Sequence, residues 1–263
     1  MDILGVKIDN LTKQEVLERI NGFFNEDGFH QIATVNPEFI LKAQKDKEFK
    51  NILNRCDLNV ADGFGIKCAF WRFRKHLKVR FAGIDLMWEI LKIADEKKLK
   101  IFLVASDEGL SLWKETAVAI KKTYPSLKIN GINTDHENHD SRSIISDSEN
   151  YEIVFCNFGA PDQEKFLNSL KNGTPPHLYE KFGNNSSCNN AANLQNQRCG
   201  GRIGLAMGVG GSFDFITGKT RRAPNFMRRL GLEWLWRLVQ QPKRIKRIFN
   251  AVIIFPIRVL FNK

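Results

Sequence analysis

The sequence predicts an α/β fold: a Rossmann-like, mostly parallel sheet with helices on both faces, followed by a basic helical C-terminal appendage. Three observations support this prediction. Short apolar runs alternate with amphipathic stretches, polar residues directly follow several of these runs, and the excess positive charge is confined to the last 45 residues. Strands that alternate with helices form parallel sheets covered on both faces.

The net charge of +11 belongs to the C-terminal tail and not to the whole chain. Residues 219–263 contain 12 Lys and Arg and one acid, Glu233, whereas residues 1–218 contain 28 basic and 28 acidic side chains. We therefore divide the chain into an α/β core, 1–218, and a basic amphipathic membrane-binding appendage, 219–263. Such a tail suits an anionic membrane surface, a nucleic acid or a polyphosphate.

Cap signals mark several helix starts. Thr12 and Glu15 have the spacing of a capping box, and Asn36 followed by Pro37 combines an N-cap with a proline at the first helical position. Asp85 is predicted to cap a further helix. Apolar or alternating patterns predict strands over residues 3–8, 31–34, 57–61, 101–105, 127–129, 153–158 and 203–207, and helices over 110–124 and from Asp162 onward.

Residues 172–201 break this alternation. They contain seven asparagines and four glycines, with few apolar residues and no periodicity. We interpret this segment as a flexible insertion in the core. Cys188 and Cys199 lie within it, but without a matching Cys/His pair two incidental thiols explain them better than a metal clip.

The pattern of the five cysteines and the N-terminal sequence indicate the cellular compartment of the protein. The cysteine count is odd, no C-x-x-C pair occurs, and the N-terminus lacks the pattern of a signal peptide. We therefore expect free thiols in a reducing cytoplasm. The apolar run 248–261 is interrupted by Asn250, Pro256 and Arg258, so it is too short and too broken to span a bilayer.

Polar side chains follow the predicted strands at the points where these end. Ligands of an open parallel sheet bind beyond the carboxyl ends of its strands, so we expect these side chains to share one site. A glycine turn after residues 203–207 lets the backbone approach a ligand and turns amides toward an anion. The set consists of Thr34, Asn36, Asp62, Arg80, Gln163, Gly208, Gly210, Gly211 and Asp214.

Each of these residues also has a purely structural explanation. Asn36 caps its helix, Asp62 forms a turn with the following glycine, and Gln163 and Glu164 are first-turn residues that the helix dipole stabilises. The prediction of a site therefore depends on all of them lying at equivalent ends of successive strands.

Several motifs then resemble a known family, the WecG/TagA/CpsF glycosyltransferases, and within it most closely the TagA type. The order and approximate spacing hold along nearly the whole chain apart from the insertion. Ala61 stands where the family often has proline, and the insertion is foreign to the pattern. The matching motifs are at residues 34–36, 61–63, 80–83, 159–164, 208–214, 222–224 and 231–237.

The resemblance implies an inverting, metal-independent transferase that needs no cofactor and works on the cytoplasmic membrane face. It would move N-acetylmannosamine from UDP to undecaprenyl-diphosphate-linked N-acetylglucosamine, the linkage step of wall teichoic acid. Asp62 would be the base. Thr34, Asn36, Arg80 and Gln163 would hold the sugars, the glycine turn would help to bind the nucleotide, and Arg222, Arg229 and Arg237 would meet the diphosphate.

This chemistry also fits the residues directly. An inverting transfer needs a carboxylate that accepts the proton of the attacking hydroxyl, and cationic or amide groups on the departing diphosphate. No D-x-D suited to a metal-held diphosphate stands at a strand end, so arginine would do the work of a metal.

Other functions compete with this interpretation. A relative could use another UDP-sugar, such as UDP-N-acetylmannosaminuronic acid. A dinucleotide enzyme would need a G-x-G-x-x-G after the first strand, which is absent. A non-enzymatic adaptor on a membrane surface or nucleic acid would explain the tail but not the strand-end residues. We expect a membrane partner and no nucleic acid; the sequence leaves homo-oligomer formation open.

The tail itself has two interpretations. From Lys243 onward, apolar residues recur at helical spacing while the charges fall largely on other faces, as in a helix that lies in a membrane interface. The alternative is a helix that docks on the core and whose charges are merely solvated. The one-sided charge favours the membrane.

Overall fold

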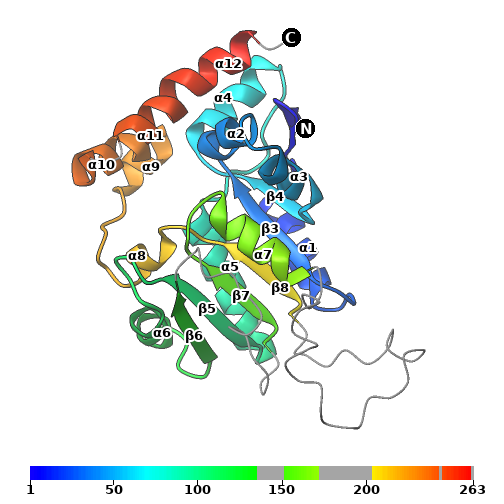
Figure 1. Cartoon of the computed structure of the whole chain (residues 1–263), viewed down its shortest axis with the longest axis vertical. Coiled ribbons are helices and arrows are strands. Elements are labelled where there is room, and N and C mark those ends of the chain that lie inside the picture. The colour runs from blue at the N-terminus through cyan, green and yellow to red at the C-terminus, as the bar shows by residue number, and fades with distance from the viewer. Residues whose placement is uncertain (135–150, 172–202, 243–244, 262–263) are drawn as a thin grey trace, which may run out of the picture.

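The structure, a computed structural model, describes residues 1–134, 151–171, 203–242 and 245–261. A six-stranded sheet with the strand order β4-β3-β8-β7-β5-β6 lies at its centre (Figure 1), and every neighbouring pair in it is parallel. The predicted α/β class is therefore confirmed. The strands are β3 His30–Val35, β4 Leu58–Ala61, β5 Lys100–Ser106, β6 Lys128–Thr134, β7 Ile153–Cys156 and β8 Leu205–Gly208.

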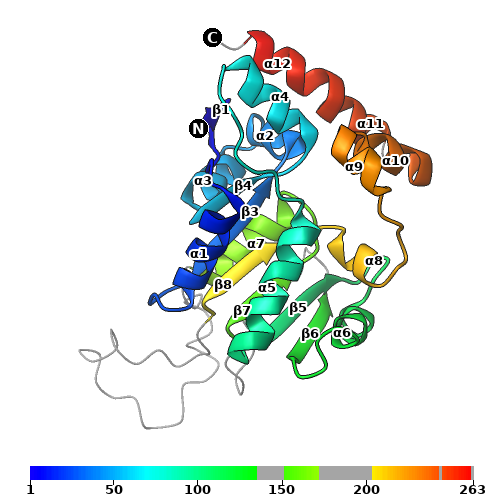
Figure 2. The same cartoon turned by 180° about the vertical axis from the view of Figure 1, so that it is seen from behind.

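Helices cover both faces of this sheet, as Figures 1 and 2 show from opposite sides. They are α1 Lys13–Phe23, α2 Pro37–Ala43, α3 Lys47–Arg55, α4 Phe64–Arg72, α5 Gly83–Lys97, α6 Trp113–Lys121, α7 Asp162–Lys171 and α8 Ser212–Ile216. Alternate residues of β3 point to opposite faces. Ile32 packs in the core cluster that contains α1 and α5, whereas Ala33 and Val35 pack in the cluster that contains α2 and α3.

The two strongest cap signals are confirmed. Thr12 Oγ1 accepts a hydrogen bond from the Glu15 amide at 3.2 Å, and the Thr12 amide donates to Glu15 Oε2 at 2.6 Å. Asn36 caps α2, and Pro37 is the first residue of that helix. These bonds satisfy amides that the first turn of a helix leaves without a partner, which is why the local signal was sufficient.

The prediction of one continuous strand over residues 3–8 is wrong. β1 Asp2–Ile3 and β2 Val6–Lys7 form an antiparallel hairpin instead. Leu4 and Gly5 turn the chain with φ of 53° and 79°, and the Asp2 carboxylate accepts from the Gly5 amide at 2.6 Å. One apolar side chain of each short strand remains buried, so the burial pattern resembles that of a single strand.

Two other boundaries differ from the prediction. Asp85 does not cap α5, because the N-cap is Ala82 and the Asp85 carboxylate binds Arg222. The helix predicted over 110–124 is the shorter α6, whose first amide, on Trp113, donates to Asn133 Oδ1 at 2.9 Å. The predicted insertion 172–201, with both of its cysteines, lies outside the described residues. Cys56, Cys68 and Cys156 are free thiols.

The C-terminal tail runs back across the top of the molecule in Figure 1. Its elements are α9 Asn225–Leu230, α10 Glu233–Gln240, α11 Ile245–Phe249, a π-helical turn η3 Asn250–Ile254, and α12 Phe255–Phe261. Phe255 and Val259 are buried in the same cluster as the apolar residues of α2 and α4. One face of the tail therefore docks on the core. Within the described part of the chain, no helix has the length and apolar character that a membrane span requires.

Candidate functional site

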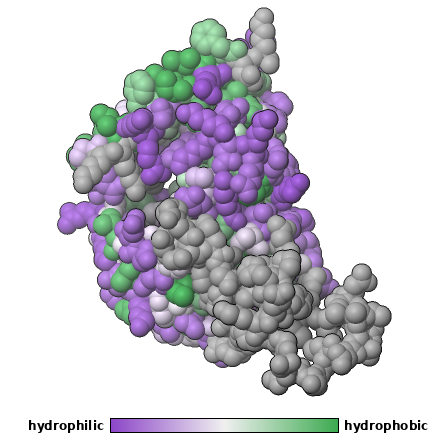
Figure 3. Space-filling model, in the orientation of Figure 1, coloured by the Kyte–Doolittle hydropathy of each residue, from purple (hydrophilic) through white to green (hydrophobic). Residues whose placement is uncertain are grey.

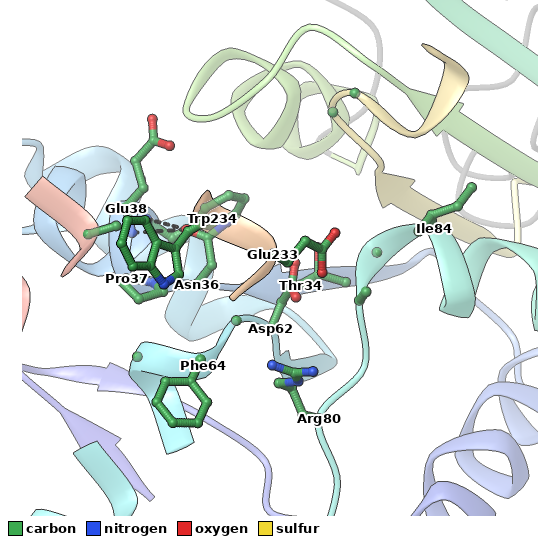
Figure 4. Close-up of a pocket in the computed structure, with 18 of the residues that line it drawn as sticks. Thr34, Asn36, Pro37, Glu38, Asp62, Phe64, Arg80, Ile84, Glu233 and Trp234 are labelled. Atoms are coloured by element: carbon green, nitrogen blue, oxygen red, sulfur yellow. Dashed lines mark hydrogen bonds between the residues drawn. The ribbon is translucent and has the colours of Figure 1, made fainter. Parts of the chain in front are cut away.

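A cavity of about 510 Å³ opens at the carboxyl ends of β3, β4 and β8, with residues of the tail on its other side. Figure 4 shows part of its lining. The structure thus brings together predicted site residues that are up to 188 positions apart, from Thr34 to Arg222. Nine predicted site residues line the cavity: Thr34, Asn36, Asp62, Arg80, Gln163, Gly208, Gly210, Gly211 and Arg222.

Three predicted residues are not in this set. Asp214 does not line the cavity; its carbonyl instead accepts from the Thr220 amide at 3.0 Å, where the chain leaves α8. The side chains of Arg229 and Arg237 lie outside the described part of the structure. Their predicted contact with a diphosphate stays a prediction.

Asp62 follows β4 directly and lines the cavity. Its amide donates to the Val35 carbonyl at 2.8 Å, which continues the parallel pairing of β3 with β4 by one residue. The sheet therefore fixes the backbone of Asp62, while its side chain keeps partial contact with solvent. In Figure 4, Asp62, Thr34 and Glu233 point into the same part of the cavity, and Arg80 lies beside them.

Asn36 is confirmed as a cap, and its orientation limits what else it can do. Its Oδ1 accepts from the amides of Glu38 at 2.9 Å and Phe39 at 3.1 Å. The acceptor end of the side chain is thus used by the helix. The amide NH₂ group is the end that a ligand in the cavity can meet, and it can only donate.

Gln163 is 2% exposed and binds two backbone segments that line the cavity. Its Oε1 accepts from the Gly159 amide at 3.1 Å and from the Gly210 amide at 3.0 Å. Its Nε2 donates to Glu164 Oε1 at 2.6 Å. The Gly210 amide, which we expected to face an anion, is therefore directed at Gln163.

Gly208 has a packing reason to be glycine. A Cβ at this position would stand 2.6 Å from Glu164 Oε1, closer than side chains approach one another in proteins. The glycine thus makes room for the Gln163–Glu164 pair beneath the turn. Gly210 adopts a φ of +48°, a conformation that glycine reaches without strain.

Cationic side chains converge from the core and the tail. Arg222 forms a bidentate pair with Asp85, with Nη–Oδ distances of 2.5 and 2.6 Å, and this pairing raises the pKa of the guanidinium. Arg80 Nη2 donates to the Arg228 carbonyl at 3.0 Å. The first pair ties the segment after α8 to the start of α5, and the second ties α9 to the connector before α5.

Comparison with known proteins identifies the family. A sequence model of the Glycosyl transferase WecG/TagA/CpsF family matches residues 1–183 and 192–263. The chain belongs to this family. The resemblance that the strand-end and tail motifs indicated is therefore confirmed, and the match covers both the core and the appendage.

Similar proteins carry the name N-acetylglucosaminyldiphosphoundecaprenol N-acetyl-beta-D-mannosaminyltransferase. One from Bacillus subtilis (strain 168) is 30% identical over 92% of this chain and 81% of its own length. One from Staphylococcus aureus (strain MRSA252) is 27% identical over 98% of this chain and 91% of its own. One from Bacillus spizizenii (strain ATCC 23059 / NRRL B-14472 / W23) is 28% identical over 83% of this chain and 74% of its own.

In this WecG/TagA/CpsF member the tail is part of the site. Glu233 and Trp234, at the start of α10, line the cavity, and so does Arg247 of α11. Arg247 binds Glu38 through two bonds of 2.9 and 3.0 Å. Burial alone would raise the pKa of Glu38, but Arg247 and Lys42 hold it below its usual value.

Sequence reasoning missed the roles of three carboxyl groups: Glu233 and Asp85 line the cavity, and Glu164 lies buried beneath the glycine turn. Glu233 stands in a tail motif that matched the family, but the motif did not indicate that it reaches the cavity of Asp62. Asp85 gave the signal of a cap, and Glu164 that of a first-turn residue. All three depend on long-range packing. Among the described residues, no group of three or more His, Cys, Asp and Glu side chains is arranged to hold a metal ion.

Proposed function

We propose that the protein is an inverting glycosyltransferase that moves N-acetylmannosamine from UDP to N-acetylglucosaminyl-diphosphoundecaprenol in wall teichoic acid linkage-unit synthesis. The observation that carries this proposal is the position of Asp62: the sheet fixes its backbone, and its side chain lines a cavity together with Thr34, Arg80 and Arg222. The names of the three relatives describe the same donor sugar and acceptor.

Asp62 would act as the general base. Its carboxylate accepts the proton of the acceptor hydroxyl while that oxygen attacks the anomeric carbon of the donor sugar. The bond from this carbon to the diphosphate breaks on the opposite side, and its electron pair leaves with UDP, so the configuration inverts. Thr34 and the Asn36 NH₂ group would bind sugar oxygens; in support of this role, both residues line the same cavity as Asp62.

The departing diphosphate carries negative charge that must be stabilised. Arg80, Arg222 and Arg228 line the cavity, and the last two come from the tail. Arg222 is held in place by Asp85, so its guanidinium is ordered before the donor binds. We propose that these arginines stabilise the negative charge of the leaving diphosphate, together with Arg229 and Arg237, as the sequence predicts.

An undecaprenyl-linked acceptor would bring the reaction to a membrane. The tail exposes large apolar side chains on the face that does not dock on the core, and Figure 3 shows hydrophobic residues along the upper edge of the molecule. We propose that this face lies in the cytoplasmic leaflet of the membrane and that Lys246 and Arg258 meet its anionic headgroups. The exposed residues are Ile245, Phe249, Ile253, Ile257, Leu260 and Phe261.

A product assay tests the function. Purified protein is incubated with a short-chain lipid-diphosphate N-acetylglucosamine acceptor and, separately, with the UDP forms of N-acetylmannosamine, N-acetylglucosamine and N-acetylmannosaminuronic acid. We expect the mass of one N-acetylhexosamine to be added with the first donor only. Transfer from the uronic acid donor alone would favour a related polysaccharide enzyme, and absence of UDP binding in calorimetry would favour a non-enzymatic adaptor.

A further inference from the structure

Glu164 is a buried carboxyl group that the proposed reaction does not use. It follows Gln163 in the first turn of α7 and is 1% exposed. Its Oε1 accepts from Gln163 Nε2 at 2.6 Å, and its Oε2 has no hydrogen-bond partner among the described residues. An unsatisfied buried oxygen costs free energy, so its retention needs a reason.

The Gln163 amide supplies that reason. A glutamine amide has one accepting end and one donating end, and the two exchange places when the group flips. Here the oxygen lies between two backbone donors, the amides of Gly159 and Gly210. After a flip, the NH₂ group would face both backbone donors, and the two bonds from Gly159 and Gly210 would be lost.

Glu164 is the acceptor that holds the amide in the required orientation. Its backbone is anchored in turn, because Gln31 Nε2 on β3 donates to the Glu164 carbonyl at 3.2 Å. The carboxyl group lies so close under the turn that Gly208 can carry no side chain. A chain of contacts therefore runs from β3 through Glu164 and Gln163 to the glycine turn.

We propose that Glu164 is a positioning residue of the donor site: it orients the Gln163 amide, which ties the loop at Gly159 to the glycine turn at Gly210. Gln163 then acts on the backbone rather than on a sugar. The two segments follow the neighbouring strands β7 and β8, and both line the cavity. Because the site is assigned to a UDP-sugar, this inference rests on the proposed function.

Kinetics and UDP calorimetry of two Glu164 variants test the proposal. Glu164→Leu removes the acceptor, so we expect the dissociation constant for UDP and the donor KM to rise about 10-fold, the cost of a lost buried hydrogen bond. Glu164→Gln keeps an acceptor oxygen, so we expect both constants to stay within about 2-fold. Asp162→Asn is the matched control, because it removes a carboxylate from the same helical turn. A folded Glu164→Leu protein that binds UDP like the wild type would overturn the proposal, and so would equal losses in the Leu and Gln variants.

A double-variant cycle separates positioning from general destabilisation. Glu164 acts through Gln163, so Gln163→Met should raise the same constants, and adding Glu164→Leu to it should cost little more. Additive losses would contradict the proposal. If Glu164→Leu fails to fold, Gln163→Met and Glu164→Gln are compared instead. Gln163→Met should still raise the UDP dissociation constant and the donor KM, whereas Glu164→Gln should leave both within about 2-fold.

Hydrogen exchange tests the positioning without relying on the function. In Glu164→Leu, or in Gln163→Met if the former does not fold, the amides of Gly159 and Gly210 should lose protection, while those of the central strand β5 keep theirs. Unchanged protection at both glycines would refute the positioning role. If wild-type protein does not bind UDP but the glycine amides respond, the assigned ligand is wrong and the network is correct.

Discussion

Asp62 and Glu164 are two carboxyl groups near strand ends of the same sheet, and their surroundings give them different tasks. Asp62 lies in the cavity with partial contact to solvent, where it can exchange a proton with a substrate. Glu164 lies beneath the glycine turn, where burial raises its pKa to about 8. The residue type alone therefore does not identify the base; the environment of each side chain does.

Replacing Asp62 by asparagine tests its assignment as the base. Asparagine keeps the shape of the side chain but cannot accept the proton, so we expect kcat to fall roughly 10²–10⁴-fold. The dissociation constant for UDP should change little, because the base meets the acceptor. Steady-state kinetics and calorimetry measure the two quantities, with exposed Asp107→Asn as the control. Turnover like that of the wild type would rule out Asp62 as the base.

Glu164 should also make the stability depend on pH. Its pKa is about 8 in the folded protein and near the ordinary 4.5 in the unfolded chain, so the folded state binds the proton more tightly. The free energy of unfolding should therefore fall as the pH rises from about 4.5 to about 8, by up to a few kcal/mol, and this contribution should be flat outside that window.

The sign follows from burial. Desolvation is the largest cause and raises the pKa of Glu164; the hydrogen bond from Gln163 and the charge of Lys42 of α2 lower it, and the charge of Asp162 of α7 raises it. The nearby thiols of Cys56 and Cys156 have raised pKa values, so they stay neutral. Urea titrations of wild type and Glu164→Gln at several pH values measure the difference. A curve for the glutamine variant that falls as steeply as the wild-type curve would contradict the assignment.

At the scale of elements, the turn between α9 and α10 decides where the tail enters the cavity. Gly231 ends α9 with a φ of +76° and lies so close to Phe64 that a Cβ would clash with its ring. Glu233 and Trp234 follow two and three residues later and line the cavity. The contact with α4 therefore places these two side chains.

Gly231→Ala should disturb this placement. Alanine at positive φ costs about 1 kcal/mol, and the clash with Phe64 adds to it by pushing the turn outward. We expect kcat/KM to fall at least 10-fold while the midpoint of thermal unfolding changes by only a few degrees. Gly218→Ala is the control, because it has nearly the same φ, +77°, and open space around it. Equal effects of the two substitutions would show that backbone strain, and not the position of the turn, is responsible.

Elements with local signals could be predicted, and those that depend on distant contacts could not. The capping box of α1 and the Asn36 cap of α2 lie within a few residues of their partners. Asp85 was predicted to be a cap because its actual partner, Arg222, is 137 positions away and no local pattern indicates it. Gln163 lies in the first turn of α7, but its bond to the Gly210 amide could not be predicted because Gly210 is 47 positions away.

For the whole molecule, the sequence indicated a parallel sheet and a shared edge for the site, but not the order of the strands. β8 lies between β3 and β7, so the last strand among the described residues completes the middle of the sheet. Apolar strands that are buried on both faces have similar patterns, so nothing local distinguishes a central position from an outer one. The sequence also left membrane binding and core docking of the tail as alternatives, whereas the buried and exposed faces of α12 allow both.

Substitutions on the two faces of the tail should separate docking from membrane binding. Phe255 is 1% exposed and packs with α2 and α4, so Phe255→Ala should lower the free energy of unfolding by about 3–5 kcal/mol. Phe249 and Ile257 are 54% and 45% exposed, so changing both to serine should leave stability nearly unchanged. The same double change should weaken binding to anionic phosphatidylglycerol vesicles at least 10-fold, since each large apolar side chain contributes roughly 1.5–3 kcal/mol when buried.

The matched control for the double variant is Val118→Ser, which removes an apolar side chain of similar exposure, 62%, from α6 in the lower half of Figure 1, away from the tail. Vesicle sedimentation measures binding, and transfer to a long-chain lipid acceptor measures the consequence for the reaction. Wild-type binding should weaken as salt rises, because the attraction of Lys246 and Arg258 to the headgroups is screened. If the double variant binds vesicles as tightly as the wild type, the exposed face of the tail does not contact the lipid. If it loses vesicle binding but still glycosylates a short, water-soluble acceptor at the normal rate, the tail has two separable roles: its exposed face brings the enzyme to the membrane, and its inner face completes the cavity around Asp62.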